Sequence, residues 1–91
     1  MQLLFKEQAL GTISDISREG FWNYGFFEKT ADYSKFTAFF KDIVSEYGFD
    51  ENKYDKDYLD DQNWYVSIPD GKKEIFIPAI YDDGEIAFRY R

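Results

Sequence analysis

The chain has 91 residues, of which 18 are acidic and 11 basic, so its formal net charge is −7. It has no cysteine and no histidine. The lack of cysteine excludes disulfides and thiolate chemistry, and the lack of histidine removes the commonest general base and metal ligand. The negative charge disfavours direct binding to DNA or RNA, and no stretch approaches the about 18 consecutive apolar residues of a membrane span. We therefore expect one compact, cytoplasmic domain that covers residues 1–91.

Aromatic residues are abundant, with 10 Phe, 8 Tyr and 2 Trp. A chain of this length buries only about 60 to 65% of its unfolded surface, whereas each aromatic side chain can bury on the order of 150 to 250 Å². Some tyrosines should therefore lie at the surface, where a large ring with a polar tip suits an interface.

Two short apolar runs, residues 2–6 and 10–17, predict a pair of N-terminal strands. A turn at residues 17–20 leads into residues 20–28, five of which are aromatic. With a period of two, one face of this aromatic strand carries Trp22, Tyr24, Phe26 and Glu28. The other face carries Phe21, Asn23, Gly25 and Phe27. A strand with rings on both faces should be covered, and we expect its rings to form the layer on which the next helix packs.

A helix is predicted over residues 33–47, because Phe36, Phe39, Phe40 and their neighbours form one apolar stripe at helical spacing. Thr30 or Asp32 should cap its first turn, and Gly48 should end it. A second, shorter helix is predicted over residues 50–61, with a hydrophobic staple between Phe49 and Tyr54. This segment has six acidic residues against two basic ones.

The C-terminal part alternates in the manner of a meander. Strands are predicted at residues 64–68, 75–81 and 86–91, with turns at residues 69–71 and at Asp83-Gly84. Pro78 should mark an edge, a bulge or a break, since it cannot donate to a strand ladder. The fold class expected is α+β: an antiparallel sheet of about five strands in the order β-β-β-α-α-β-β-β, with a long and a short helix on one face.

Three segments together resemble a family of small, uncharacterised bacterial α+β domains. They are Gly11-Thr12-Ile13, the strand Trp22-x-x-Gly25-x-Phe27-Glu28 with the following Phe36/Phe39/Phe40 helix, and the tail from Pro69-Asp70-Gly71 to Ala87-Phe88-Arg89. Members carry Pro before the Trp, where this chain has Phe21. The resemblance implies one α+β domain and no site residues.

No catalytic, metal or cofactor site is predicted. The adjacent pairs Asp60/Asp61 and Asp82/Asp83 should point apart into water, and the acidic segment lacks the glycine and the terminal glutamate of an EF-hand loop. Glu28 is the strongest candidate for a general base because its strand is buried. An ion pair between Glu28 and Arg89 or Arg91 across the sheet is the favoured interpretation.

We therefore predict a non-enzymatic, acidic protein-binding module, of the kind that immunity proteins and inhibitors represent, for a basic partner. The predicted partner-binding residues are Asp50, Tyr54, Asp57, Tyr58, Asp61 and Tyr65. The alternative is a domain, monomer or homodimer, that binds a small ligand or itself through the aromatic strand. Its predicted ligand face consists of Phe21, Asn23, Gly25, Phe27, Glu28 and Arg89.

Overall fold

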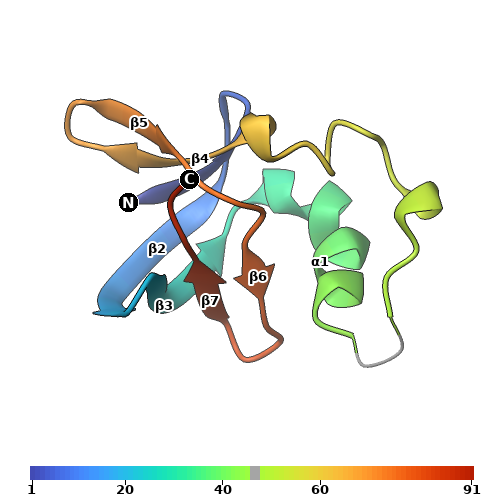
Figure 1. The fold of residues 1–91 in the computed structure, drawn as a ribbon, viewed down its shortest axis with the longest axis horizontal. Helices are drawn as coiled ribbons and strands as arrows, with labels where there is room; N and C mark the ends of the chain where they lie inside the picture. Colours follow the sequence, from blue (N-terminus) through green and yellow to red (C-terminus); the bar gives the residue numbers. More distant parts are fainter. Residues whose placement is uncertain (46–47) are drawn as a thin grey trace.

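The computed structural model describes residues 1–45 and 48–91, and its fold is mixed α+β with a seven-stranded antiparallel sheet (Figure 1). The elements in chain order are β1 Gln2–Phe5, β2 Gln8–Glu19, β3 Trp22–Lys29, η1 Ala31–Phe36, α1 Thr37–Ile43, η2 Glu51–Lys53, η3 Asp61–Asn63, β4 Trp64–Ile68, β5 Gly71–Glu74, β6 Ala79–Ile80 and β7 Glu85–Phe88. The predicted fold class is thus confirmed in outline, while the numbers of strands and helices differ.

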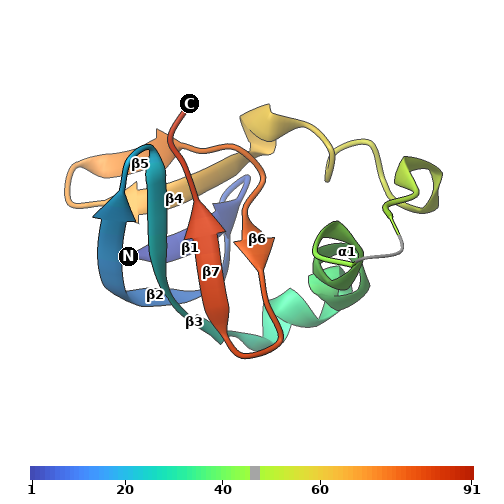
Figure 2. The same ribbon diagram turned by 60° about the horizontal axis from the view of Figure 1, so that its bottom comes forward.

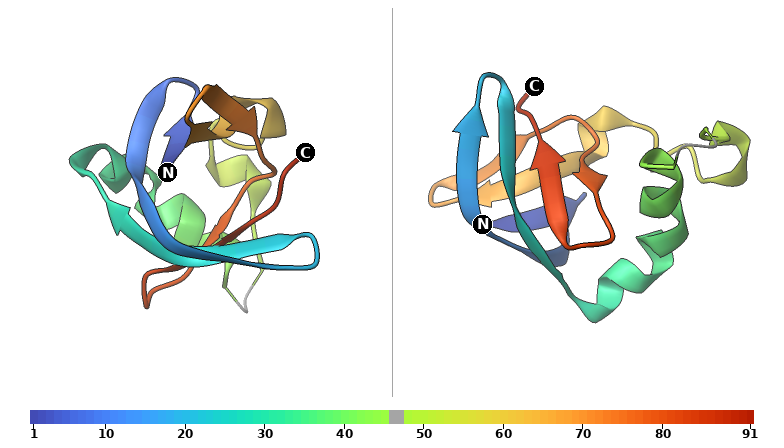
Figure 3. Two further views of the ribbon diagram at one scale, coloured as in Figure 1. Left: turned by 90° about the vertical axis from the view of Figure 1, so that its left-hand side faces the viewer. Right: turned by 90° about the horizontal axis from the view of Figure 1, so that it is seen from below.

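The strands follow the order β5-β4-β1-β2-β3-β7-β6, and the sheet curls so that the segment after β5 pairs with the segment after β7. Ile75, directly after β5, pairs with Tyr90, which follows β7. Phe76 N donates to the Arg89 carbonyl at 3.0 Å, and Arg91 N donates to the Glu74 carbonyl at 3.2 Å. The result is an incompletely closed barrel, with α1 beside it (Figures 2 and 3).

The predicted N-terminal strands are confirmed, and β2 and β3 form a long hairpin whose tip lies away from α1 (Figure 3). The tip consists of Gly20 and Phe21, because Glu19 pairs with Trp22. A bulge interrupts the ladder, since Asp15 and Ile16 together lie opposite Gly25. A Cβ at Gly25 would lie 2.7 Å from the Ser14 carbonyl oxygen, so the absence of a side chain lets the bulged strand approach β3.

The first helix begins as a 3₁₀ segment and ends at Ile43, four residues before the predicted end at Tyr47, which lies outside the described residues. Thr30 occupies the N-cap position, as one of the two predicted caps, but its side chain forms no capping hydrogen bond. The Thr30 hydroxyl instead donates to β2, with the Leu10 carbonyl at 3.0 Å, and this bond fixes the start of the helix against the barrel. The β-branched pair Ile43-Val44, followed by Ser45, has low helix propensity and favours an early end.

The second predicted helix is wrong. Residues 48–63, which we call the acidic strap, contain only the short 3₁₀ turns η2 and η3. Asp50, Asp55 and Asp60 each accept a hydrogen bond from the backbone amide two residues later, at 2.9 to 3.0 Å. Aspartate side chains that bond locally in this way compete with helical hydrogen bonds, so the segment forms a series of turns. The contact expected between Phe49 and Tyr54 is nevertheless present, with the rings stacked at 5.6 Å.

The C-terminal strands are shorter and more numerous than predicted. Strand β5 is not predicted, because Gly71–Glu74 is charged and wholly exposed and so has no apolar pattern. The predicted strand at 75–81 is broken at the buried Pro78, one of the three outcomes predicted for this proline. Strand β7 ends at Phe88, short of the predicted Arg91. Ile80 pairs with Ile86 and Tyr81 N bonds to Glu85, so the turn has three residues, Asp82 to Gly84, in place of the predicted two.

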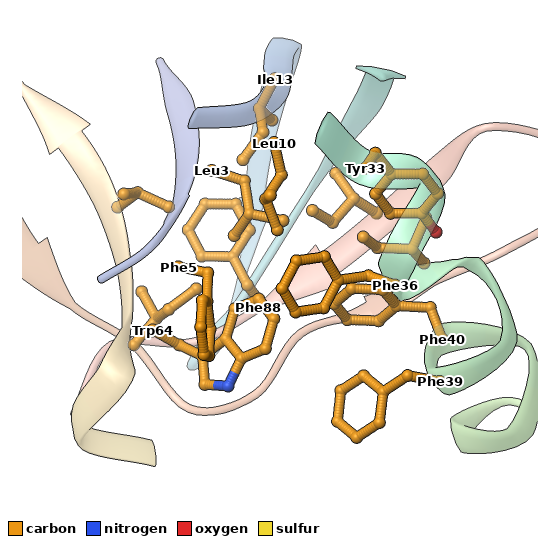
Figure 4. Packing of buried hydrophobic residues seen from close by; sticks show 14 residues of the cluster. Leu3, Phe5, Leu10, Ile13, Tyr33, Phe36, Phe39, Phe40, Trp64 and Phe88 are labelled. Carbon is orange, nitrogen blue, oxygen red and sulfur yellow. The ribbon is translucent and has the colours of Figure 1, made fainter. Parts of the chain in front are cut away.

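The hydrophobic core fills the barrel and the gap between barrel and helix (Figure 4). Phe36, Phe39 and Phe40 point from the helix toward Trp64, and their ring centroids lie 5.4 to 6.1 Å from its ring. Phe5 from β1 packs on the same indole at 4.9 Å. The stripe that predicted the helix is therefore its core face, and Trp64 contacts three rings of that face from the sheet.

Candidate functional site

In strand β3, the side that carries most of the predicted ligand face points toward the interior of the protein. Asn23 and Gly25 are buried, and Phe27 packs against Tyr33 of the helix at 5.2 Å. Phe21 is separate from them, at the hairpin tip, where it is 79% exposed. The residues Phe21, Asn23, Gly25 and Phe27 thus do not form one open surface, and only Phe27 contributes to the layer under the helix.

The opposite face of β3 is open to solvent. Trp22 is 41% and Phe26 57% exposed, with the half-buried Tyr24 between them. The guanidinium carbon of Arg89 lies 5.5 Å from the Trp22 ring and 4.6 Å from the ring of Phe76. Arg89 thus lies against two exposed rings, the geometry of a cation–π contact. We call Trp22, Tyr24, Phe26, Phe76 and Arg89 the aromatic face.

Carboxylates surround the aromatic face. Glu19 pairs with Trp22 across the β2–β3 ladder, Glu85 pairs with Phe26 across the β3–β7 ladder, and Glu28 follows Phe26 on the same side. Asp15 and Glu85, together with Tyr24 and Phe26, line a shallow hollow of about 180 Å³. These carboxylates give the surroundings of Trp22, Tyr24 and Phe26 negative charge, which favours contact with cationic groups.

The acidic strap holds its tyrosines against the core. Tyr58 packs on Phe36 at 4.6 Å and on Phe5 at 5.5 Å, and Trp64 Nε1 donates to the Tyr58 carbonyl at 2.8 Å. Tyr54 lies 5.3 Å from Phe39, and its hydroxyl donates to the Asp42 carboxylate. These two rings stabilise the strap from beneath and are not displayed as an open pair.

The other predicted partner-binding residues are spread over several elements. Asp50 caps η2, Asp57 forms an ion pair with Lys6 at 2.8 Å, and the half-buried Asp61 accepts from the backbone amide of Ile77 at 3.1 Å. Tyr65 is on β4, where the ammonium of Lys72 lies 4.1 Å from its ring centroid. The strap is acidic and exposed, but most of these groups are already engaged within the chain.

The hydrogen bond between Tyr54 and Asp42, with burial and the charges of Asp42 and Asp50, raises the pKa of Tyr54 to about 12. The unfolded value is about 10, so the neutral hydroxyl stabilises the fold below pH ~10, and this contribution is lost as the pH rises toward ~12. We expect Tyr54→Phe to lower the free energy of unfolding by about 0.5 to 1.5 kcal/mol at neutral pH. In urea unfolding at several pH values, this difference should shrink between pH ~10 and ~12. A difference that stays constant across this range would argue against the bond.

The ion pair expected at Glu28 is not formed: within residues 1–45 and 48–91, Arg91 pairs with Glu74 at 2.8 Å and Arg89 lies over the rings of the aromatic face. The register explains the difference. Phe26 is opposite Glu85, the first residue of β7, so Glu28 lies beyond the start of that strand and far from Arg89. Glu28 is exposed at this position.

Within residues 1–45 and 48–91, no group of three or more carboxylates is arranged to hold a metal ion. The same residues contain no helix with the length and apolar character needed to cross a membrane.

Comparison of the chain with known protein families, curated proteins and solved structures found no match. The resemblance to small bacterial α+β domains therefore stays a prediction, and the site must be judged from its geometry. The predicted site residues include only Arg89 of the aromatic face. Trp22, Tyr24 and Phe26 belong to the face of the strand opposite the predicted ligand face, and Phe76 is not predicted for any site. Its pairing with Arg89 depends on the closure of the barrel, and no local pattern in the sequence indicates it.

Proposed function

We propose that this protein is a non-enzymatic binding module that holds a basic, partly apolar protein partner on its aromatic face. The observation that carries the proposal is a group of exposed rings on one face: Arg89 lies against Trp22 and Phe76, and Phe26, on the same side of β3 as Trp22, pairs with Glu85. Tryptophan, tyrosine and arginine are the residue types that most often dominate the energy of protein interfaces. An acidic rim and a net charge of −7 would speed the approach of a basic partner.

The proposal keeps the basic partner that composition predicts and moves the contact surface from the acidic strap to β3 and β7. The contact surface moves because the rings of Tyr54 and Tyr58 pack against core residues, whereas the rings of Trp22 and Phe26 are exposed to solvent. An immunity or inhibitor protein is one form that such a module can take.

Short peptides that contain one aromatic residue and a graded number of lysines or arginines test the chemistry of the partner. We expect affinity, measured by titration calorimetry, to rise with peptide charge and to fall with added salt, because the rim charges are exposed and screened by ions. The double variant Asp15→Asn/Glu85→Gln should weaken binding by about two- to tenfold, the range for exposed charge pairs.

The matched control is Glu7→Gln/Glu51→Gln, which removes the same charge away from the aromatic face and should preserve affinity. An equal loss in both double variants would mean that only net charge matters and would contradict the proposed site. Sedimentation of the free protein distinguishes the self-association alternative, since a mass that rises with concentration and falls on Trp22→Ala would assign the face to a second copy of the chain.

A further inference from the structure

A second cavity, separate from the aromatic face, lies where the helix meets the barrel. It has a volume of about 190 Å³ and is bounded by the end of β3, by one side of the helix and by the β6–β7 turn. Its lining residues are Phe27, Lys29, Tyr33, Thr37, Lys41, Ile80, Tyr81, Asp82 and Gly84. Tyr33, Thr37 and Lys41 are four residues apart, so they lie along one side of the helical segment.

The walls of this cavity combine polar side chains with apolar and aromatic ones. Tyr33 and Ile80 are buried, and the Phe27 and Tyr33 rings pack at 5.2 Å with an angle of 60° between their planes. Phe27 N donates to the Gly84 carbonyl at 2.7 Å, which holds the β6–β7 turn against β3. The cavity is therefore bounded by elements that the fold fixes, and its rings offer surfaces on which a flat group can stack.

The charges of the cavity differ from those of the rest of the molecule. It contains Lys29 and Lys41 against the single carboxylate of Asp82, a local excess of positive charge in a chain with a net charge of −7. Neither lysine ammonium group forms a hydrogen bond or an ion pair with any residue of the described ranges 1–45 and 48–91. Asp82 and Tyr33 both line the cavity, and burial, followed by the charge of Asp82, raises the pKa of the Tyr33 phenol. Two unpaired ammonium groups beside aromatic walls suit a ligand with one negative charge and a flat apolar body.

We infer that this cavity is a binding site for a small aromatic carboxylate, whose ring would lie against Phe27 and Tyr33 and whose carboxylate would pair with Lys29 and Lys41. A partner protein is not required, so the inference stands apart from the proposed function. An inorganic anion would use the lysines but not the rings, and a neutral aromatic molecule would use the rings but not the lysines.

Benzoate is the probe, with benzamide as its neutral isostere and acetate as the anion without a ring. Titrations followed by backbone amide NMR should show saturable shifts at Phe27, Tyr33 and Thr37 with benzoate, and weaker binding of benzamide and acetate. Lys29→Gln and Lys41→Gln should each weaken benzoate binding by about two- to fivefold, as expected for exposed ion pairs. Asp82→Asn should strengthen it, because a repelling charge is removed.

Lys56→Gln serves as the matched control, since this exposed lysine does not line the cavity. The inference is supported if benzoate binds more tightly than both comparison probes and if the lysine and aspartate variants shift its affinity in opposite directions. Equal binding of benzoate and benzamide, no shifts at the cavity residues, or an equal loss in Lys56→Gln would overturn it.

Discussion

Replacing Trp64 by alanine should remove about 3 to 5 kcal/mol from the free energy of unfolding, as is typical for a fully buried tryptophan. Trp64 has no exposed surface, contacts rings from the helix and from β1, and donates a hydrogen bond through Nε1 to the strap. A domain of this size has a free energy of unfolding of only about 5 to 15 kcal/mol, so the variant should lose a large fraction of its stability. Urea unfolding followed by far-UV circular dichroism measures the loss.

The second tryptophan provides the control. Trp22 is 41% exposed and contacts Arg89 on the surface, so Trp22→Ala should cost about 1 kcal/mol or less. If Trp64→Ala fails to fold, Trp64→Phe replaces it, because it keeps an aromatic ring in the core. Its loss of stability should be smaller than that expected for Trp64→Ala but still larger than that of Trp22→Ala. Equal losses for Trp22→Ala and Trp64→Ala would contradict the assignment of one indole to the core and the other to the surface.

The period of two in β3 was enough to predict which residues share a face. Trp22, Tyr24 and Phe26 do lie together, as do Asn23, Gly25 and Phe27. It could not predict which face points inward, because both carry rings. The inward face is the one on which Phe27 packs against Tyr33 of the helix and on which β2 approaches β3 closely at Gly25. Such contacts join residues that are distant in the sequence.

The acidic strap shows a different limit of sequence reasoning. The spacing of Tyr54 and Tyr58 fits a helix, and both rings do pack on one side, against Phe39. The aspartates at positions 50, 55 and 60 decide the backbone instead, since each closes a local turn with its own side chain. The apolar pattern thus placed Tyr54 and Tyr58 on one side of the segment correctly, but it predicted neither their packing against the core nor the secondary structure.

The aromatic face should lose the basic partner when its rings are removed. For Trp22→Ala/Phe26→Ala we expect affinity for the best basic aromatic peptide to fall by about a hundredfold or more, since hot-spot rings each contribute roughly 2 kcal/mol. The two side chains are exposed, so the variant should keep the wild-type circular dichroism spectrum. Phe49→Ala, which removes an exposed ring from the strap, should leave the affinity unchanged.

Mapping of the bound peptide by amide NMR tests the central claim most directly, because it reports where the partner binds without any substitution. The aromatic-face account predicts that the largest shifts occur at Trp22, Tyr24, Phe26, Phe76 and Arg89 and that they vanish in Trp22→Ala/Phe26→Ala. Shifts concentrated in residues 48–63 of the acidic strap, with the aromatic face unperturbed, would contradict it.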